Sequence, residues 1–178
     1  GYHVKEQRFL TIDEAENYLF SGFFNTQTTK SDIEKRYLDY AASQVKPYRN
    51  ANIKYQYISM PYSVYSQETN NSNQGSIDIV SAIKKEIEKK GARLIIVEAA
   101  AGFGKTCTAY EVYKSFAETT SFHKPIFTEL SRNRDAKQFK YILWSEIDKE
   151  KETTAKQDLV VYNIKNGRIP LIIDGFDE

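Results

Sequence analysis

The residues best suited to chemistry lie between positions 99 and 107, in the run Ala-Ala-Ala-Gly-Phe-Gly-Lys-Thr-Cys. Glycines let backbone N–H groups turn inward around an anion, and a helix N-terminus adds partial positive charge. Lys105 can reach the β- and γ-phosphates of a nucleotide, and the Thr106 hydroxyl can ligate Mg²⁺. We therefore predict a phosphate-binding loop whose binding residues are Ala99, Ala100, Ala101, Gly102, Phe103, Gly104, Lys105, Thr106 and Cys107.

A buried strand and a helix must flank such a loop. The apolar run from Leu94 to Val97 predicts a parallel strand buried on both faces. Behind the loop, apolar residues recur at helical spacing: Ala109, Tyr110, Tyr113, Phe116 and Ala117. The usual motif, G-x-x-x-x-G-K-[ST], has glycine where this chain has Ala99, a position that turns the chain without holding phosphate. The alternative is a small-residue turn followed by a chance Gly-Lys-Thr, and the flanking elements favour the loop.

A group of carboxylates follows a second apolar run, Ile169 to Ile173. An acid at the C-terminal end of a parallel strand lies on the edge where α/β sheets bind ligands. We predict that Asp174 holds the water shell of Mg²⁺. Asp177 and Glu178 are the predicted catalytic residues, because carboxylates beyond the metal ligand can orient or polarise the attacking water. Taken alone, these acids are equally typical of a solvated turn.

Both motifs resemble those of one family. The run A-A-A-G-F-G-K-T is similar to the G-x-x-G-x-G-K-[ST] loop of the NACHT family, and L-I-I-D-G-F-D-E is similar to its Walker B signature. That family belongs to the STAND class of signalling ATPases, which includes animal innate immune receptors and bacterial antiviral defence proteins. The resemblance covers residues 76–178, and the stretch before residue 76 matches no motif that we can name.

The resemblance implies an α/β P-loop NTPase fold, three αβα layers around a mainly parallel sheet. It implies ATP or ADP and Mg²⁺ as cofactors, and a switch from an inactive state to an active homo-oligomer, in immune or antiphage defence. Effector and sensor domains would lie elsewhere in a longer chain. The family's next strand would insert between the loop strand and the Walker B strand, so we expect residues 1–178 to be truncated and inactive as an ATPase alone. The alternatives are a scaffold that holds ADP without turnover, and an AAA+-like motor or a kinase.

Composition and charge limit the kinds of binding partner and the compartment that we expect. The chain has 178 residues, a formal net charge of +1 and 40% hydrophobic residues, which suffice for a packed core. The balanced charge gives no footprint for nucleic acid or an anionic membrane. No apolar stretch approaches the ~18 residues that span a bilayer. The single cysteine, Cys107, excludes an internal disulfide and suits a reducing compartment, so we expect a cytoplasmic protein.

The polar stretch 69–75 is the predicted boundary between an N-terminal helical and extended segment, residues 1–75, and the nucleotide-binding part. Capping boxes at Thr11 and Ser31 predict two helices in that segment. Residues 53–66 alternate apolar with polar side chains and predict an edge strand or extended segment. In proteins of the resembled class such a segment helps to cover adenine, which makes Pro61 and Tyr62 candidates for that role.

Four further elements are predicted after the boundary. Ser76 is the predicted cap of a helix that turns Val80, Ile83 and Ile87 inward. A strand is predicted at 125–130, and Asp135 is the predicted cap of a helix that aligns Ala136, Phe139, Leu143 and Ile147. The last is a capped helix at 154–164, of which residues 159–162 could alternatively form a strand.

Overall fold

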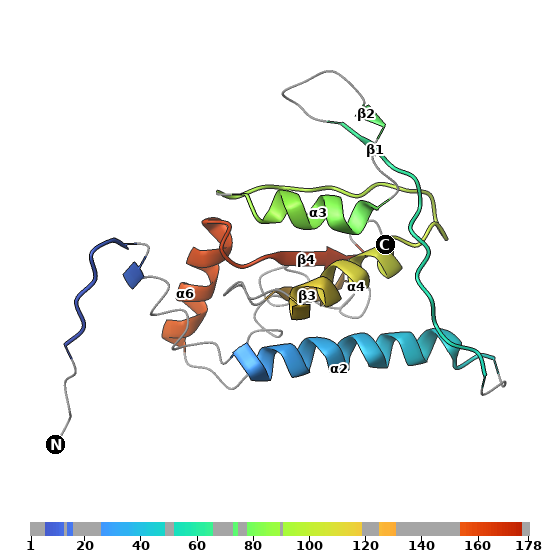
Figure 1. The fold of residues 1–178 in the computed structure, drawn as a ribbon, viewed down its shortest axis with the longest axis horizontal. Helices are drawn as coiled ribbons and strands as arrows, with labels where there is room; N and C mark the ends of the chain where they lie inside the picture. The colour runs from blue at the N-terminus through green and yellow to red at the C-terminus, as the bar shows by residue number, and fades with distance from the viewer. Residues whose placement is uncertain are drawn as a thin grey trace.

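The computed structural model describes residues 6–12, 14–15, 26–48, 52–65, 73–74, 78–89, 91–118, 125–130 and 154–175. Its helices and strands follow one another along the chain as α2 (Thr26–Val45), β1 (Ser63–Val64), β2 (Asn73–Gln74), α3 (Ile79–Ile87), α4 (Lys105–Ser115), the 3₁₀ helix η1 (Phe116–Glu118), β3 (Ile126–Glu129), α6 (Thr154–Lys165) and β4 (Leu171–Asp174). Figure 1 shows their arrangement. No helix in these ranges is both long and apolar enough to cross a membrane.

The centre of the fold is the parallel pair formed by β3 and β4, in which Phe127 lies opposite Ile172. Side chains alternate along each strand, so the pair has two apolar faces. Phe127 and Ile172 pack with α4, whereas Ile126 and Leu171 pack with α6. The predicted strand at 125–130 and the predicted helix at 154–164 are thus confirmed, and the alternative of a strand at 159–162 is wrong. The predicted helix after Asp135 lies outside the described residues.

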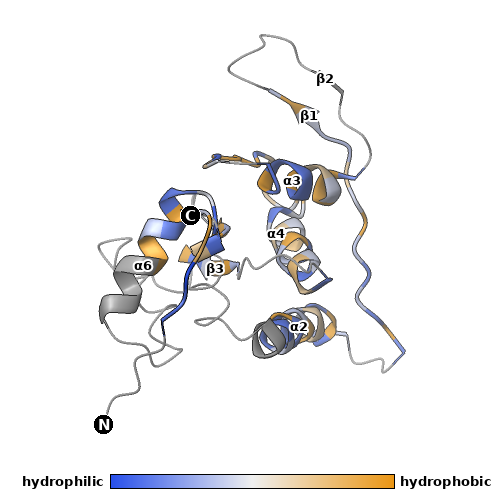
Figure 2. Cartoon of the chain, turned by 60° about the vertical axis from the view of Figure 1, so that its left-hand side comes forward, coloured by the Kyte–Doolittle hydropathy of each residue, from blue (hydrophilic) through white to orange (hydrophobic). Residues whose placement is uncertain are grey.

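Helix α4 lies between α3 and α2, and Figures 1 and 2 both show this order. The predicted apolar face of α4 is confirmed, since Tyr110, Tyr113 and Phe116 are buried. α3 contributes the three aliphatic residues that the sequence turns inward, Val80, Ile83 and Ile87. The main core is therefore a helical layer on one face of the strand pair.

The predicted strand at 94–97 is wrong. Residues 91–97 are extended but belong to no strand, and Figure 1 shows them running beside α3 in the same direction as β4. Leu94 is 87% and Ile96 69% exposed, the opposite of a strand buried on both faces. The physical reason is that a buried strand needs neighbours for its backbone hydrogen bonds, and no described strand pairs with this segment.

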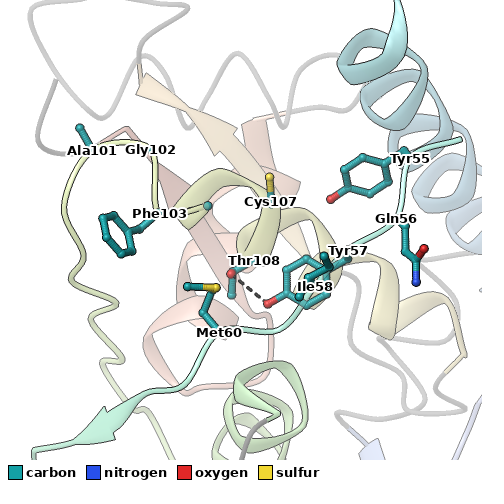
Figure 3. Close-up of a pocket in the computed structure, with 11 residues that line it drawn as sticks. Tyr55, Gln56, Tyr57, Ile58, Met60, Ala101, Gly102, Phe103, Cys107 and Thr108 are labelled. Atoms are coloured by element: carbon teal, nitrogen blue, oxygen red, sulfur yellow. Dashed lines mark hydrogen bonds between the residues drawn. The ribbon is translucent and has the colours of Figure 1, made fainter. Parts of the chain in front are cut away.

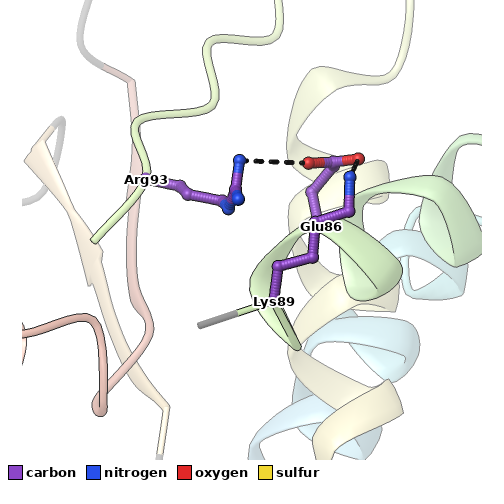
Figure 4. Close-up of polar contacts among 3 residues, drawn as sticks. All are labelled: Glu86, Lys89 and Arg93. Carbon is purple, nitrogen blue, oxygen red and sulfur yellow. Dashed lines mark hydrogen bonds and ion pairs between the residues drawn. The ribbon is translucent and has the colours of Figure 1, made fainter. Parts of the chain in front are cut away.

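An ion pair and a close backbone approach hold the first residues of this extended segment. Figure 4 shows Arg93 facing Glu86 of α3, with Nη1 3.7 Å from Oε2, while Lys89 contacts the same carboxylate. Gly91 meets the turn before β4, where a Cβ built on Gly167 would lie 2.5 Å from the Gly91 carbonyl oxygen. The segment thus begins beside the start of β4.

Two predicted helix starts need correction. α2 begins at Thr26, so Ser31 lies inside the helix and does not cap it. α3 is capped by Asp78, whose side chain accepts a hydrogen bond from the Ser81 amide. The predicted cap of α3, Ser76, lies outside the described residues. At Thr11 one bond of the predicted capping box is present, because the Glu14 amide donates to the Thr11 hydroxyl; the Glu14 carboxylate accepts from the amide of Leu10, one residue before the predicted cap.

Candidate phosphate-binding site

The loop at 99–104 leads into the N-terminus of α4 through two glycines with positive φ. Gly102 has φ of 82°, and Gly104, the N-cap residue, has φ of 78°. L-residues with a side chain rarely adopt this region, so these positions favour glycine. The loop is closed by Lys105, whose Nζ donates to the Ala99 carbonyl oxygen at 2.8 Å.

This geometry fits a phosphate group. The first backbone amides of α4 have no acceptor within the helix, as in any α-helix, so they can donate to an anion. The dipole of this eleven-residue helix also places partial positive charge at its N-terminus. Lys105 already reaches across the loop mouth, so its ammonium stands where an anion would meet both it and the helix N-terminus. Ala100, Ala101, Phe103 and Thr106 are exposed, and nothing lies within 4 Å of a Cβ built on Gly102.

Contacts along α4 show that its N-terminus lies beyond the carboxyl ends of the strands. Tyr113 packs on Phe127, with ring centroids 5.3 Å apart. One turn earlier, Tyr110 donates a hydrogen bond to the Glu129 carboxylate at the end of β3. Because a helix rises ~1.5 Å per residue, Thr106 lies about 6 Å further in the same direction. The loop and the ends of β3 and β4 therefore share one edge.

Asp174 ends β4 on this edge and lies in register with Glu129. Strand alternation places Asp174 on the face that packs against α4, the same face as Ile172. The fold thus brings the predicted metal residues, Thr106 and Asp174, to one edge and one layer. No group of three or more His, Cys, Asp and Glu side chains in the described ranges could hold a metal ion. Asp177 and Glu178, the predicted catalytic residues, lie outside the described residues.

A cavity of about 430 Å³ adjoins the loop. One wall is the extended segment from Tyr55 to Met60, and the other is the loop and the first turn of α4. Figure 3 shows the Ile58, Met60 and Phe103 side chains around it. Pro61 and Tyr62, the residues proposed above to cover adenine, do not line it. The lining is mainly apolar and aromatic, on the loop wall as well as on the wall formed by residues 55–60.

Tyrosine hydroxyls surround the start of α4. Tyr40 of α2 donates to Cys107 Sγ at 3.0 Å, and the Tyr57 and Thr108 hydroxyls are 3.1 Å apart. In Figure 3 the Tyr55 hydroxyl also points toward Cys107. Burial raises the pKa of Tyr40 and of Tyr55 well above the ordinary value, so both phenols are protonated at neutral pH.

Sequence reasoning missed Tyr40, Tyr57 and Glu129. Glu129 carried a usable signal, because it is an acid at the end of a predicted strand, as Asp174 is. Tyr55 and Tyr57 alternate along the segment, which indicates one shared face. Nothing local indicates that this face meets α4. The Tyr57–Thr108 and Tyr40–Cys107 pairs are 51 and 67 positions apart in sequence.

A comparison with known families gives one match. A family model described as NACHT-associated inactive Restriction Endonuclease 2 matches residues 1–65, less than half of the 178-residue chain. No match was found among curated proteins or among solved structures.

This match corrects the resemblance stated above. The matched family is not the NACHT P-loop ATPase, and it lies on the segment for which no motif was named rather than on residues 76–178. By its description the family is NACHT-associated. That association agrees, at this coarse level, with the expected NACHT-related multidomain signalling protein.

Proposed function

We propose that the loop at 99–106 and the carboxyl end of β4 bind the phosphates of ATP or ADP together with Mg²⁺, within a P-loop type α/β fold. The observation that carries the proposal is the loop itself. Two glycines with positive φ lead into the N-terminus of α4, and Lys105 Nζ lies 2.8 Å from the Ala99 carbonyl oxygen across the loop. These are the donors and the charge that a polyphosphate requires.

The same site has a place for the rest of a nucleotide. The cavity of about 430 Å³ lies within the ~300–1,000 Å³ of small-molecule sites, and it opens directly beside Gly102 and Gly104. Its Tyr57, Ile58 and Met60 side chains offer apolar and aromatic surface to a base. A nucleotide whose phosphates occupy the loop would extend its base toward residues 55–60.

Mg²⁺ would be held by the Thr106 hydroxyl and, through water, by Asp174. The support is their shared edge, which follows from the contacts of Tyr110 and Tyr113 with β3. Mg²⁺ suits such a site because it keeps several waters and takes few protein ligands. When bound, the ion would neutralise phosphate charge.

The coarse association with NACHT proteins supports a proposal for the wider role. We propose that nucleotide occupancy switches a longer protein between an inactive state and an active homo-oligomer, with residues 1–65 as its matched N-terminal segment. A nucleotide shifts such an equilibrium only if it binds the two states with different affinity.

Nucleotide binding is tested by calorimetric titration of the full-length protein with ATP and Mg²⁺. Lys105→Ala removes a charge-assisted contact of about 1.5–3 kcal/mol, so affinity should fall at least about tenfold. Lys85→Ala is the matched control, because Lys85 is an exposed lysine of α3. Equal affinity of the Lys105→Ala variant and the wild type would refute the site.

Hydrolysis is tested separately with the double variant Asp177→Asn and Glu178→Gln. It keeps the shape of both side chains and removes their charge. Turnover should fall by about 10²–10⁴ while ATP binding persists, and the variant should accumulate as the oligomer. Unchanged turnover would show that these acids form only a solvated turn. Lost turnover in a protein that stays monomeric would retain the ATPase and refute the switch.

A further inference from the structure

Tyrosines from the part of the chain before α3 form hydrogen bonds with the first turn of α4. Lys105 and Thr106 are followed directly by Cys107 and Thr108, the two residues that contact Tyr40 and Tyr57. Thr108 also donates its amide to the Gly104 carbonyl oxygen at 2.9 Å. The loop glycine, the phosphate residues and the two tyrosine contacts therefore occupy one helical turn.

The contact of α2 with α4 is aromatic and directional. The Tyr40 ring stacks on Tyr110 at 3.8 Å with the planes 7° apart. The Tyr37 hydroxyl donates to Glu111 at 2.6 Å, and Lys114 Nζ lies 4.4 Å above the Tyr37 ring. Aromatic and hydrogen-bonded contacts depend on angle as well as distance. A small rotation or shift of α4 would therefore disturb this interface.

The extended segment at residues 55–60 makes a second contact with α4. Tyr55 lies edge-on to Tyr40 at 5.8 Å, so the segment packs against α2 as well as against α4. Tyr57 then reaches Thr108, one residue beyond the Tyr40 contact. All three tyrosines belong to residues 1–65, the part of the chain that matches the NACHT-associated family.

We propose that docking of residues 26–48 and 52–60 on α4 is coupled to phosphate binding at the loop, with Tyr40 and Tyr57 as its positioning residues. The inference rests on the proposed function. Phosphate binding fixes the first turn of α4, and that same turn presents Cys107 and Thr108 to the tyrosines. Coupling is reciprocal, so a docked N-terminal segment tightens nucleotide binding and bound nucleotide tightens docking by the same factor.

The test uses conservative variants in the full-length protein. Tyr57→Phe and Tyr40→Phe remove one hydroxyl each and keep the rings. Tyr65→Phe is the matched control, because Tyr65 belongs to the same segment and is 83% exposed. Thermal melting first establishes that each variant is folded.

Two readouts are then taken, the dissociation constant for ATP with Mg²⁺ and amide exchange of residues 26–48 and 52–60. Tyr57→Phe should weaken ATP binding about fivefold, as expected for one net hydrogen bond, and Tyr65→Phe by less than about twofold. Saturating ATP should slow exchange in these residues of the wild type and slow it less in the Tyr57→Phe variant.

A double-mutant cycle separates positioning from general destabilisation. Tyr57→Phe, Thr108→Val and the double variant should lose the same ATP affinity, because each breaks one shared bond. Additive losses of ATP affinity would overturn the coupling. If the wild type binds ATP and the variants bind it equally tightly, the coupling is also overturned. A wild type that binds no ATP would refute the proposed function itself, and with it this coupling.

Discussion

We expect Phe127→Ala to destabilise the protein far more than Leu94→Ala, although both positions lie in apolar runs of the sequence. Phe127 is 1% exposed, and its ring lies 4.5 Å from that of Tyr110 and 5.3 Å from that of Tyr113. The Arg36 guanidinium lies 4.9 Å from the ring centroid. Leu94 is 87% exposed.

The magnitudes follow from burial. Truncating a buried phenylalanine costs about 3–5 kcal/mol, because apolar contacts are lost and a cavity remains. Truncating an exposed leucine changes stability by about 0.5 kcal/mol or less. A domain has only about 5–15 kcal/mol in total, so Phe127→Ala removes a large share. Phe127→Leu fills more of the space and should lie between the two.

Urea denaturation followed by circular dichroism measures these changes. With a slope of about 2 kcal/mol/M, Phe127→Ala should lower the midpoint by about 1.5–2.5 M. Leu94→Ala should leave the midpoint nearly unchanged. A large loss for Leu94→Ala would mean that residues 94–97 are a buried strand after all, and a loss below about 1 kcal/mol for Phe127→Ala would contradict the core described above.

Three further predictions concern stability. Asp78→Ala should lower the free energy of unfolding by about 1 kcal/mol, because it removes the cap of α3. Hydrogen bonds from Ser81 lower the pKa of Asp78, so the stabilisation by Asp78 is present above the ordinary value of 3.8 and is lost as the pH falls through the lowered pKa. Urea melts across that pH range would show this loss in the wild type and not in Asp78→Ala. Gly167→Ala should lower the melting temperature more than Gly102→Ala. Both glycines have positive φ, but only a Cβ at Gly167 would lie 2.5 Å from a backbone atom, the Gly91 carbonyl oxygen. Equal effects would contradict this contact. Burial raises the pKa of Tyr40 well above its ordinary value of 10.0, so its contribution to stability is complete below about pH 10 and declines as the pH rises from there toward the raised pKa. Urea melts at about pH 8 and at about pH 11 should therefore show a larger loss of stability in the wild type than in Tyr40→Phe, and equal losses would argue against the shift.

Local patterns explain why the loop, α4 and the strands β3 and β4 could be predicted. Gly102, Gly104 and the apolar spacing behind them are short-range signals, and a helix or strand expresses them within its own length. The start of α2 was misplaced because a capping box at Ser31 is indistinguishable in sequence from the same residues inside a longer helix.

The rest depends on contacts between distant residues. Leu94 to Val97 carry a typical buried-strand composition, yet burial requires a neighbouring strand, which composition does not supply. The Tyr40–Cys107 contact joins α2 to α4 and leaves no periodic signal in either. The cavity could not be predicted for the same reason, because its walls come from residues 55–60 and 101–108.

The central claim, phosphate binding at the loop, is tested most directly by backbone amide resonances. Isotope-labelled protein is titrated with ATP and Mg²⁺, and the shift of each amide is recorded. We predict that the largest shifts fall on residues 102–106, where the N–H groups of the loop and of the α4 N-terminus would meet the phosphates. Smaller shifts should follow at residues 55–60, along the cavity. Saturating nucleotide that leaves the amides of residues 102–106 unchanged would contradict the account.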